Sequence, residues 1–168
     1  MILDCGGRDD LIGPDLLNNL DYISPNETEL LRIDPDIDIN NPVEEIRTKI
    51  MSKYKNLKFI LKLGGKGSAV ITDSLYIHVP VVTAINEKTK EDFKIIDTVG
   101  AGDCFTSAFT VKLLEQNAGE DSDWSEVYRK ALLFGNSSAF LCITKKGAMP
   151  SMPSREAVDK LQADYNLQ

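Results

Sequence analysis

Apolar and polar positions along the chain alternate with periods that predict strands separated by helices. Short apolar runs, bounded by glycine, proline or polar clusters, predict strands at 1–4, 22–24, 57–64, 67–72, 75–82 and 93–97. The pair 67–72 and 75–82 is expected to form a hairpin or meander around Asp73 and Ser74.

Apolar residues at helical spacing predict a second set of elements. They lie in a short turn after Pro14, from Asn26 through Leu31, from Pro42 to about Tyr54, and at 101–116, 123–143 and 154–163. Strands that alternate with helices are typical of an α/β fold with a mostly parallel sheet, and the length favours one domain over 1–168. In such sheets ligands bind beyond the carboxyl ends of the strands.

Composition narrows the class of protein. The chain is 42% hydrophobic and 27% charged, as in ordinary globular domains, and its net charge is -7. An acidic surface repels phosphate backbones and anionic lipid, so neither nucleic acid nor a membrane is an expected partner. A small anionic ligand remains compatible with this charge. The first residues lack the features of a signal peptide, and no apolar run approaches the ~20 residues of a membrane span.

Cysteine and histidine are too scattered for a metal site of their own. Cys5, Cys104 and Cys142 stand far apart in the sequence, no CxxC occurs, and His78 is the only histidine. Reduced thiols in a cytoplasmic protein are the expected state, with a nuclear share left open.

The stretch DTVGAGD at 97–103 joins the last predicted strand to the helix at 101–116. Gly100 and Gly102 allow close approach to the free N–H groups at the start of that helix, where a phosphoryl group could bind. Asp103 has two readings. It could cap the helix, or it could accept a proton from an attacking hydroxyl. Spacing alone does not decide between them.

Other catalytic loops are absent from the sequence. In LGGKGS at 63–68, Gly67 stands where a Walker A loop needs serine or threonine, and no GxxxxGK[ST] pattern occurs. The chain also lacks a GxSxG elbow and a GxGxxG turn near its start.

Four segments together resemble the ribokinase-like (PfkB) family of sugar kinases. They are DTVGAGDCF, ISPNETEL at 23–30, LKLGGKGS at 61–68, and FGNSSAFLCITKKGAMPSMPSR at 134–155. They occur in the family's order and span nearly the whole chain. The last segment favours the ribokinase branch over fructokinase or adenosine kinase. The resemblance implies a three-layer α/β/α fold around a mostly parallel sheet.

The resemblance also implies roles for matching residues. Asp103 would be the catalytic base and would contact the sugar, and Gly100, Ala101 and Gly102 would form the anion hole. Asn26 would contact the nucleotide phosphates, and Glu29 would position Mg²⁺ through water. The nucleotide would also be held by Lys62, Leu63, Gly64, Gly65, Lys66, Gly67, Gly102, Asp103 and Asn136. A monovalent cation, K⁺, would be surrounded by Asp97, Val99, Cys142, Lys145, Gly147 and Ser151.

Simpler readings of these residues stay open. Glu29 could be only an acid in the first turn of a helix, and Asn26 could be only its N-cap. Asn136 on an apolar helix fits a satisfied core amide. Lys62 occupies a position where the family often has threonine, which leaves its role the least secure.

The chain departs from the family in length. Family members are considerably longer, and this chain resembles only their C-terminal part, without the N-terminal half and the β lid that carry the sugar contacts and the homodimer interface. Whether the chain is a fragment stays open. We expect an exposed sheet edge, marginal stability and self-association for residues 1–168 alone. The charged stretch 86–92 resembles a local insertion without an assigned function.

The expected activity is ATP-dependent phosphorylation of D-ribose to D-ribose 5-phosphate, with Mg²⁺ and K⁺. One alternative is a nucleotide-binding module without catalysis, because most of the sugar pocket is absent. Another is a related fructose or nucleoside kinase.

Overall fold

The computed structural model describes residues 1–7, 10–82 and 94–167, and the chain divides into two compact units. The first unit comprises Met1–His78 and the second Val79–Gln168. The sequence predicts one domain over 1–168, which would contain both units, and this stays a prediction. The charged stretch 86–92 lies outside the described residues.

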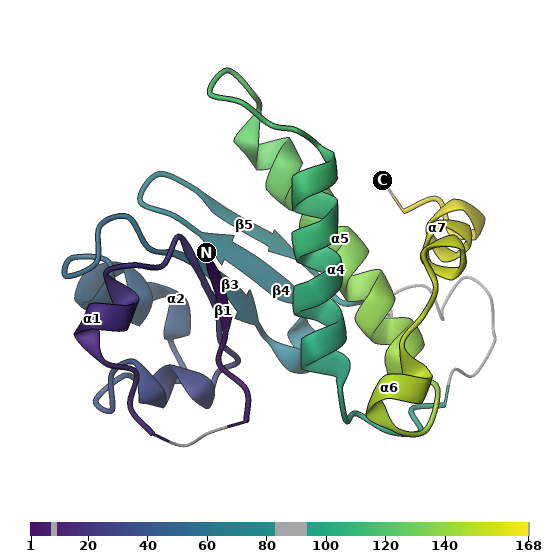
Figure 1. Ribbon diagram of the computed structural model, residues 1–168, viewed down its shortest axis with the longest axis horizontal. Coiled ribbons are helices and arrows are strands. Elements are labelled where there is room, and N and C mark those ends of the chain that lie inside the picture. Colours follow the sequence, from purple (N-terminus) through teal and green to yellow (C-terminus); the bar gives the residue numbers. More distant parts are fainter. Residues whose placement is uncertain (8–9, 83–93, 168) are drawn as a thin grey trace. The chain divides into compact units, whose positions relative to one another are not determined.

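A mixed sheet of five strands, in the order β1-β2-β3-β4-β5, organises the first unit (Figure 1). The strands are β1 (Ile2–Asp4), β2 (Tyr22–Ser24), β3 (Lys58–Lys62), β4 (Ser68–Ile71) and β5 (Tyr76–Val79). β1, β2 and β3 pair in parallel, and β4 pairs antiparallel with β3. The α/β class is therefore confirmed, and the parallel part of the sheet comprises its first three strands.

Short helices connect these strands. They are α1 (Pro14–Leu17), the 3-10 helices η1 (Glu29–Arg32) and η3 (Gly64–Lys66), α2 (Pro42–Glu45), and the π-helical turn η2 (Ile46–Ile50). The helix expected from Pro42 to Tyr54 was predicted too long. The N–H groups of Lys53 and Tyr54 both donate to the Ile50 carbonyl, so the chain turns there instead of continuing as a helix.

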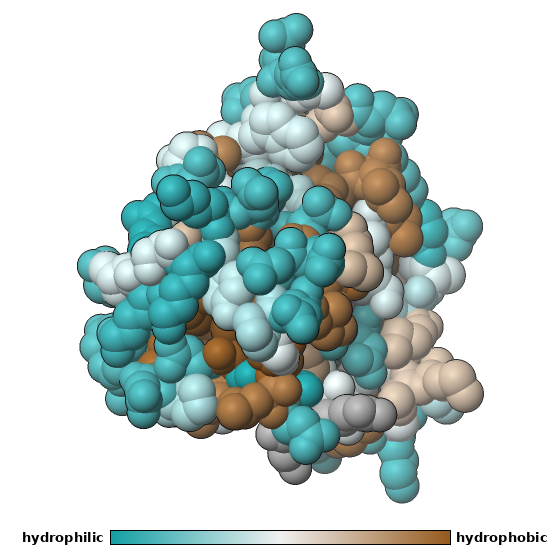
Figure 2. Space-filling model, turned by 60° about the vertical axis from the view of Figure 1, so that its left-hand side comes forward, coloured by the Kyte–Doolittle hydropathy of each residue, from teal (hydrophilic) through white to brown (hydrophobic). Residues whose placement is uncertain are grey.

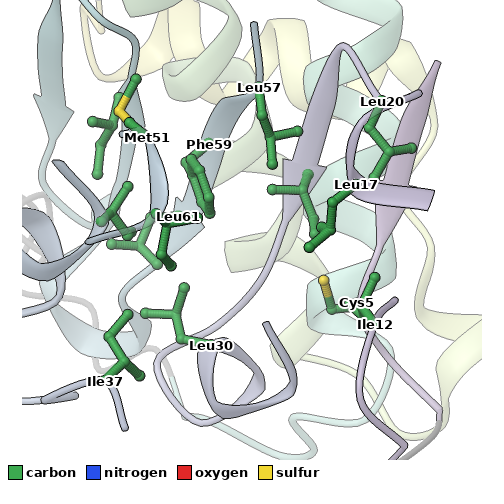
Figure 3. Packing of buried hydrophobic residues seen from close by; sticks show 14 of the residues in the cluster. Cys5, Ile12, Leu17, Leu20, Leu30, Ile37, Met51, Leu57, Phe59 and Leu61 are labelled. Carbon is green, nitrogen blue, oxygen red and sulfur yellow. The ribbon is translucent and has the colours of Figure 1, made fainter. Parts of the chain in front are cut away.

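The core of the first unit lies against one face of the sheet. Phe59 and Leu61 of β3 are fully buried and stand opposite Ile71 and Ala69 of β4. Because side chains alternate along a strand, all four point to the same face. Figure 3 shows Phe59 and Leu61 among the other buried side chains of this cluster, which includes Leu30 of η1.

Helices make up most of the second unit: α4 (Ala101–Glu115), α5 (Trp124–Ile143), α6 (Ala148–Ser151) and α7 (Arg155–Asp164). The predicted helices at 101–116, 123–143 and 154–163 are confirmed, and α6 was not predicted. α4 and α5 lie side by side (Figure 1). A Cβ at Gly135 of α5 would come within 2.7 Å of the Phe105 ring of α4, so the two helices are in close contact. No helix in the described ranges is long and apolar enough to cross a membrane.

The predicted strand at 93–97 was wrong for the residues that the structure describes. Residues 94–98 have no regular secondary structure, and Ile95 and Ile96 are 59% and 55% exposed. The N–H groups of Ile96 and Asp97 both donate to the Ile143 carbonyl at the end of α5. An apolar run forms a strand only where its backbone N–H and C=O groups bond to a neighbouring strand. Here the N–H groups bond to the end of a helix instead.

Apolar side chains also reach the surface. Figure 2 shows a face that is mostly hydrophilic, with hydrophobic residues visible between the polar ones. In the second unit, Leu114 and Met149 are 70% and 86% exposed. The expected self-association remains a prediction.

Candidate functional site

The glycine turn before α4 has a conformation that requires glycine. Gly100 is the N-cap of α4 and has φ of 83°, in the left-handed region. A Cβ at this position would lie 2.9 Å from the Cα and Cβ atoms of Ala148. The turn therefore depends on glycine both for its backbone angle and for the close approach of Ala148.

The start of α4 presents free hydrogen-bond donors. Ala101 N donates to the Thr98 carbonyl at 3.2 Å, and Cys104 N donates to the Gly100 carbonyl at 2.9 Å. Between them, the N–H groups of Gly102 and Asp103 have no acceptor among the described residues. These donors lie at the positive end of a helix of 15 residues, which favours an anionic group there.

The carboxylate of Asp103 stands beside these donors. It is exposed and makes no hydrogen bond or ion pair within the part of the chain that the structure describes. The simpler sequence reading, in which Asp103 caps α4, is wrong because Gly100 is the N-cap and no side chain caps this helix. An uncommitted carboxylate beside free N–H donors could accept a proton from a hydroxyl group held there.

Asp97 connects two loops of the second unit. Its Oδ1 accepts from Val99 N at 3.0 Å and its Oδ2 accepts from Gly147 N at 2.8 Å. These hydrogen bonds lower the pKa of the Asp97 carboxyl group, and the Lys146 charge acts in the same direction. The carboxylate thus holds the glycine turn to the residues that follow α5.

Residues after α5 form a second set of contacts. The Cys142 carbonyl accepts from Lys145 N at 3.1 Å. The thiol of Cys142 lies 3.0 Å from the Ser151 hydroxyl, which donates to the Ala148 carbonyl at 2.7 Å. The structure therefore brings together several of the residues expected around a monovalent cation, including Asp97 with Gly147 and Cys142 with Ser151.

In the first unit, Asn26 and Glu29 cap each other's backbone. The Asn26 Oδ1 accepts from Glu29 N, and the Glu29 Oε2 accepts from Asn26 N, both at 2.8 Å. This reciprocal pair has the geometry of a capping box. Asn26 thus accepts from the N–H group of Glu29, although Thr28 is the N-cap of η1. The second carboxylate oxygen of Glu29, Oε1, has no hydrogen-bond partner among the described residues.

Lys62 joins this group from the end of β3. Its Nζ lies 3.1 Å from each carboxylate oxygen of Asp4 and 3.6 Å from Glu29 Oε2. Sequence reasoning missed Asp4, which was taken only as the end of a strand. An acid at the carboxyl end of β1 and a lysine at that of β3, with β2 between them in a parallel sheet, is the pattern that could have indicated the pair. Burial, together with the negative charge of Glu29, raises the pKa of the neighbouring Cys5 thiol to about 12.

The glycine-rich loop after β3 is tight. Leu63 N donates to the Gly67 carbonyl at 2.9 Å, and Gly64 and Gly67 have φ of 52° and 98°. Lys66 in this loop is 78% exposed at its side chain and lies 3.6 Å from Glu27. Gly65 has open space beside it.

Asn136 is buried in α5 and bonded to the main chain. Its Nδ2 donates to the carbonyls of Val79 and Pro80 at 3.1 and 3.2 Å. This geometry fits the core-amide reading, and the nucleotide contact stays a prediction. Within the described residues, no group of three or more His, Cys, Asp or Glu side chains is arranged to hold a metal ion.

Comparison with known proteins agrees with this geometry. The model of the pfkB family carbohydrate kinases matches residues 6–155. The chain belongs to the pfkB family of carbohydrate kinases. Its matched region includes the glycine turn, the capping box and Lys62.

Ribokinases are among the relatives of this pfkB chain. It is 36% identical over 166 residues to a ribokinase of Arabidopsis thaliana, covering 96% of this chain and 38% of the relative. The structure of Arabidopsis thaliana ribokinase complexed with ribose and ATP is similar with a TM-score of 0.73 and 35% identity, over 95% of this chain and 46% of that one. The ribokinase-like fold is thereby confirmed, and the chain spans less than half the length of these relatives.

A shorter similarity extends to another branch. The chain is 38% identical over 68 residues to a probable fructokinase of Arabidopsis thaliana, covering 40% of this chain and 20% of the relative. The similarity to the ribokinase extends over far more of the chain.

Proposed function

We propose that this chain is the nucleotide-binding and catalytic part of a sugar kinase that phosphorylates D-ribose with ATP to give D-ribose 5-phosphate. The observation that carries the proposal is the exposed carboxylate of Asp103 next to the N–H groups of Gly102 and Asp103, all of them without a partner among the described residues. The similarity to a ribokinase complexed with ribose and ATP supports this choice of substrates.

Phosphoryl transfer depends on alignment and on charge stabilisation. In our proposal Asp103 accepts the proton of the sugar's primary hydroxyl as its oxygen attacks the γ-phosphoryl group. The main chain of Gly100, Ala101 and Gly102 receives the transferred phosphoryl, because the N–H group of Gly102 has no acceptor among the described residues. Asn26, the loop from Lys62 to Gly67, and Asn136 are the proposed nucleotide contacts.

Glu29 fits a supporting role toward Mg²⁺. This ion keeps several waters and is bound through one or two carboxylates together with substrate phosphates. Glu29 Oε1 has no protein partner among the described residues, whereas Oε2 is held by Asn26 N. The ion would supply charge neutralisation of the nucleotide phosphates, and Glu29 would orient it through water.

Asp97 and the residues around it are the proposed K⁺ site. Carbonyl oxygens suit a weakly hydrated cation, and the proposed donors are the carbonyls of Val99, Cys142, Lys145 and Gly147 with the Ser151 side chain. The contact of Asp97 with Gly147 N supports a link between this site and the glycine turn.

Two alternatives have observations in their favour. The chain covers 38% of its ribokinase relative, which favours a nucleotide-binding part that needs further residues for turnover. The fructokinase similarity favours fructose as acceptor. We further propose a cytoplasmic protein without nucleic-acid or membrane partners, whose complete form is a homodimer through a lid outside this chain.

The test is ADP formation by the purified chain with ATP and Mg²⁺, with ribose, fructose and adenosine as competing acceptors. The proposal predicts that ribose is the preferred acceptor. Preference for fructose or adenosine would instead indicate a fructose or nucleoside kinase. ATP binding without ADP formation on any acceptor would favour the nucleotide-binding alternative.

A further inference from the structure

The Lys62 ammonium lies among the carboxylates at the ends of the parallel strands. Asp4 ends β1, Lys62 ends β3, and Glu29 begins η1 after β2. A parallel bridge between Asn26 and Lys62, together with the hydrogen bond from Lys62 N to the Pro25 carbonyl at 2.9 Å, fixes the backbone of Lys62 beside the capping box. The Lys62 side chain is only 12% exposed, against 26% for Asp4 and 19% for Glu29.

The ammonium is shared unequally between two acids. It lies 3.1 Å from both oxygens of Asp4 and 3.6 Å from Glu29 Oε2. One positive charge therefore faces two negative charges in a partly buried place, where charges interact more strongly than in water. Asp4 holds the ammonium more closely, which leaves the Glu29 carboxylate only partly neutralised.

We propose that Lys62 is a positioning residue that competes with a divalent cation for Glu29, and that Asp4 sets the balance by drawing the ammonium away from Glu29. This inference deepens the proposed function, since it concerns the carboxylate assigned there to Mg²⁺. A lysine at this place weakens direct capture of the metal by the protein alone and keeps Glu29 oriented until a metal–nucleotide complex arrives.

The proposal predicts opposite effects for two substitutions that break the same ion pair. Lys62→Met removes the competing charge, so the affinity for a divalent cation rises. Asp4→Asn releases the ammonium toward Glu29, so that affinity falls, while the asparagine oxygen can still accept from Gly6 N as Asp4 does. If the pair only kept the local fold intact, both substitutions would disturb that fold and weaken binding of the cation.

The experiment measures Mn²⁺ binding to the purified chain, without nucleotide, by electron paramagnetic resonance. We expect Lys62→Met to bind Mn²⁺ about fivefold more tightly than the unmodified chain and Asp4→Asn to bind it about fivefold more weakly. Glu29→Gln should abolish the difference made by Lys62→Met. The double variant K62M/D4N should bind Mn²⁺ more tightly than Asp4→Asn, which keeps the test decisive should Lys62→Met fold poorly.

The ion pair of Lys53 and Asp34, with 3.4 Å between Nζ and Oδ2, provides matched controls, and its lysine side chain is 61% exposed. Lys53→Met and Asp34→Asn change the net charge equally and should change Mn²⁺ affinity much less. Shifts of the same sign for Lys62→Met and Asp4→Asn, or shifts no larger than in the controls, would overturn the inference.

A parallel titration with ATP separates this inference from the proposed function. If the Mn²⁺ order holds and ATP does not bind, the role of Lys62 stands and the kinase proposal falls. If ATP binds and the Mn²⁺ order is absent, the kinase proposal stands and the role of Lys62 falls.

Discussion

At the scale of single residues, Gly100 and Asp97 fix the shape of the proposed anion hole. The first supplies a left-handed turn that other residues rarely adopt, and the second ties that turn to Gly147. Neither residue needs to touch a substrate for its loss to affect the site. Two substitutions test these contributions separately.

Gly100→Ala should destabilise the fold by about 1–3 kcal/mol, because φ of 83° is strained for alanine and the new Cβ would meet Ala148 at 2.9 Å. Urea unfolding measures the change. Gly119→Ala is the control, since Gly119 has no positive φ and open space around it, and it should leave the free energy of unfolding nearly unchanged. Equal effects of the two substitutions would contradict the assigned role.

The lowered pKa of Asp97 predicts how the stability of the fold depends on pH. Its folded pKa lies below the ordinary value of 3.8, so its contribution to stability is present above that value and is lost as pH falls through the folded pKa. Asp97→Asn should lower the thermal midpoint at pH 6, because one side-chain oxygen cannot accept from both Val99 N and Gly147 N. The difference between the two proteins should shrink below pH 3.8. A difference that stays constant with pH would count against the carboxylate's role.

At the scale of elements, the contact between α4 and α5 positions the glycine turn. Gly135 permits this contact, because a methyl group there would enter the Phe105 ring. The same helix α4 begins at the proposed anion hole. Packing at Gly135 therefore bears on the element that carries the site.

Gly135→Ala should cost about 1–3 kcal/mol of unfolding free energy through overpacking. Adding Phe105→Leu should recover part of that loss, since the smaller side chain makes room for the methyl group. The two single variants and the double variant form a thermodynamic cycle measured by urea unfolding. If the changes in unfolding free energy of the two substitutions simply add, positions 135 and 105 are not coupled and the overpacking explanation is wrong.

Sequence periodicity predicted the long helices and the parallel strands because their apolar positions repeat regularly. It failed at 93–97, where the hydrogen bonds of Ile96 and Asp97 go to Ile143 rather than to a strand. It also overextended the helix after Pro42. Local patterns do not reveal which distant group will accept a hydrogen bond.

The candidate site was predictable to different degrees. The glycine turn and Asp103 lie in one continuous stretch, so spacing and resemblance could find them. Asp4 lies 58 positions from Lys62 in the chain, and only the order of the sheet brings them together. The simpler sequence readings were an N-cap for Asn26 and a first-turn acid for Glu29. The reciprocal hydrogen bonds between the two residues were not predicted and emerged only in the fold.

At the scale of the whole molecule, the similarity to the ribokinase of Arabidopsis thaliana covers 96% of this chain but only 38% of that relative. The proposed nucleotide and catalytic residues lie within this chain, and Asp103 is its proposed contact with the sugar. ADP formation and its dependence on cations are therefore measured on all 168 residues of this chain.

Cation dependence tests the proposed K⁺ site. ADP formation with ribose should be faster in K⁺ than in Na⁺ at equal ionic strength, because carbonyl ligands suit the less strongly hydrated ion. Asp97→Asn should reduce this preference. Equal rates in the two salts, or an unchanged preference in the variant, would remove the assigned role of Asp97.

The most direct test of the central claim compares the chain with Asp103→Asn in ribose-dependent ADP formation, with ATP affinity measured by calorimetry on the same samples. The account predicts a loss of turnover of about 10²-fold or more in the variant with ATP affinity nearly unchanged, because the substitution removes only the proton acceptor. Equal turnover by the two proteins, or no ATP binding by either, would contradict it.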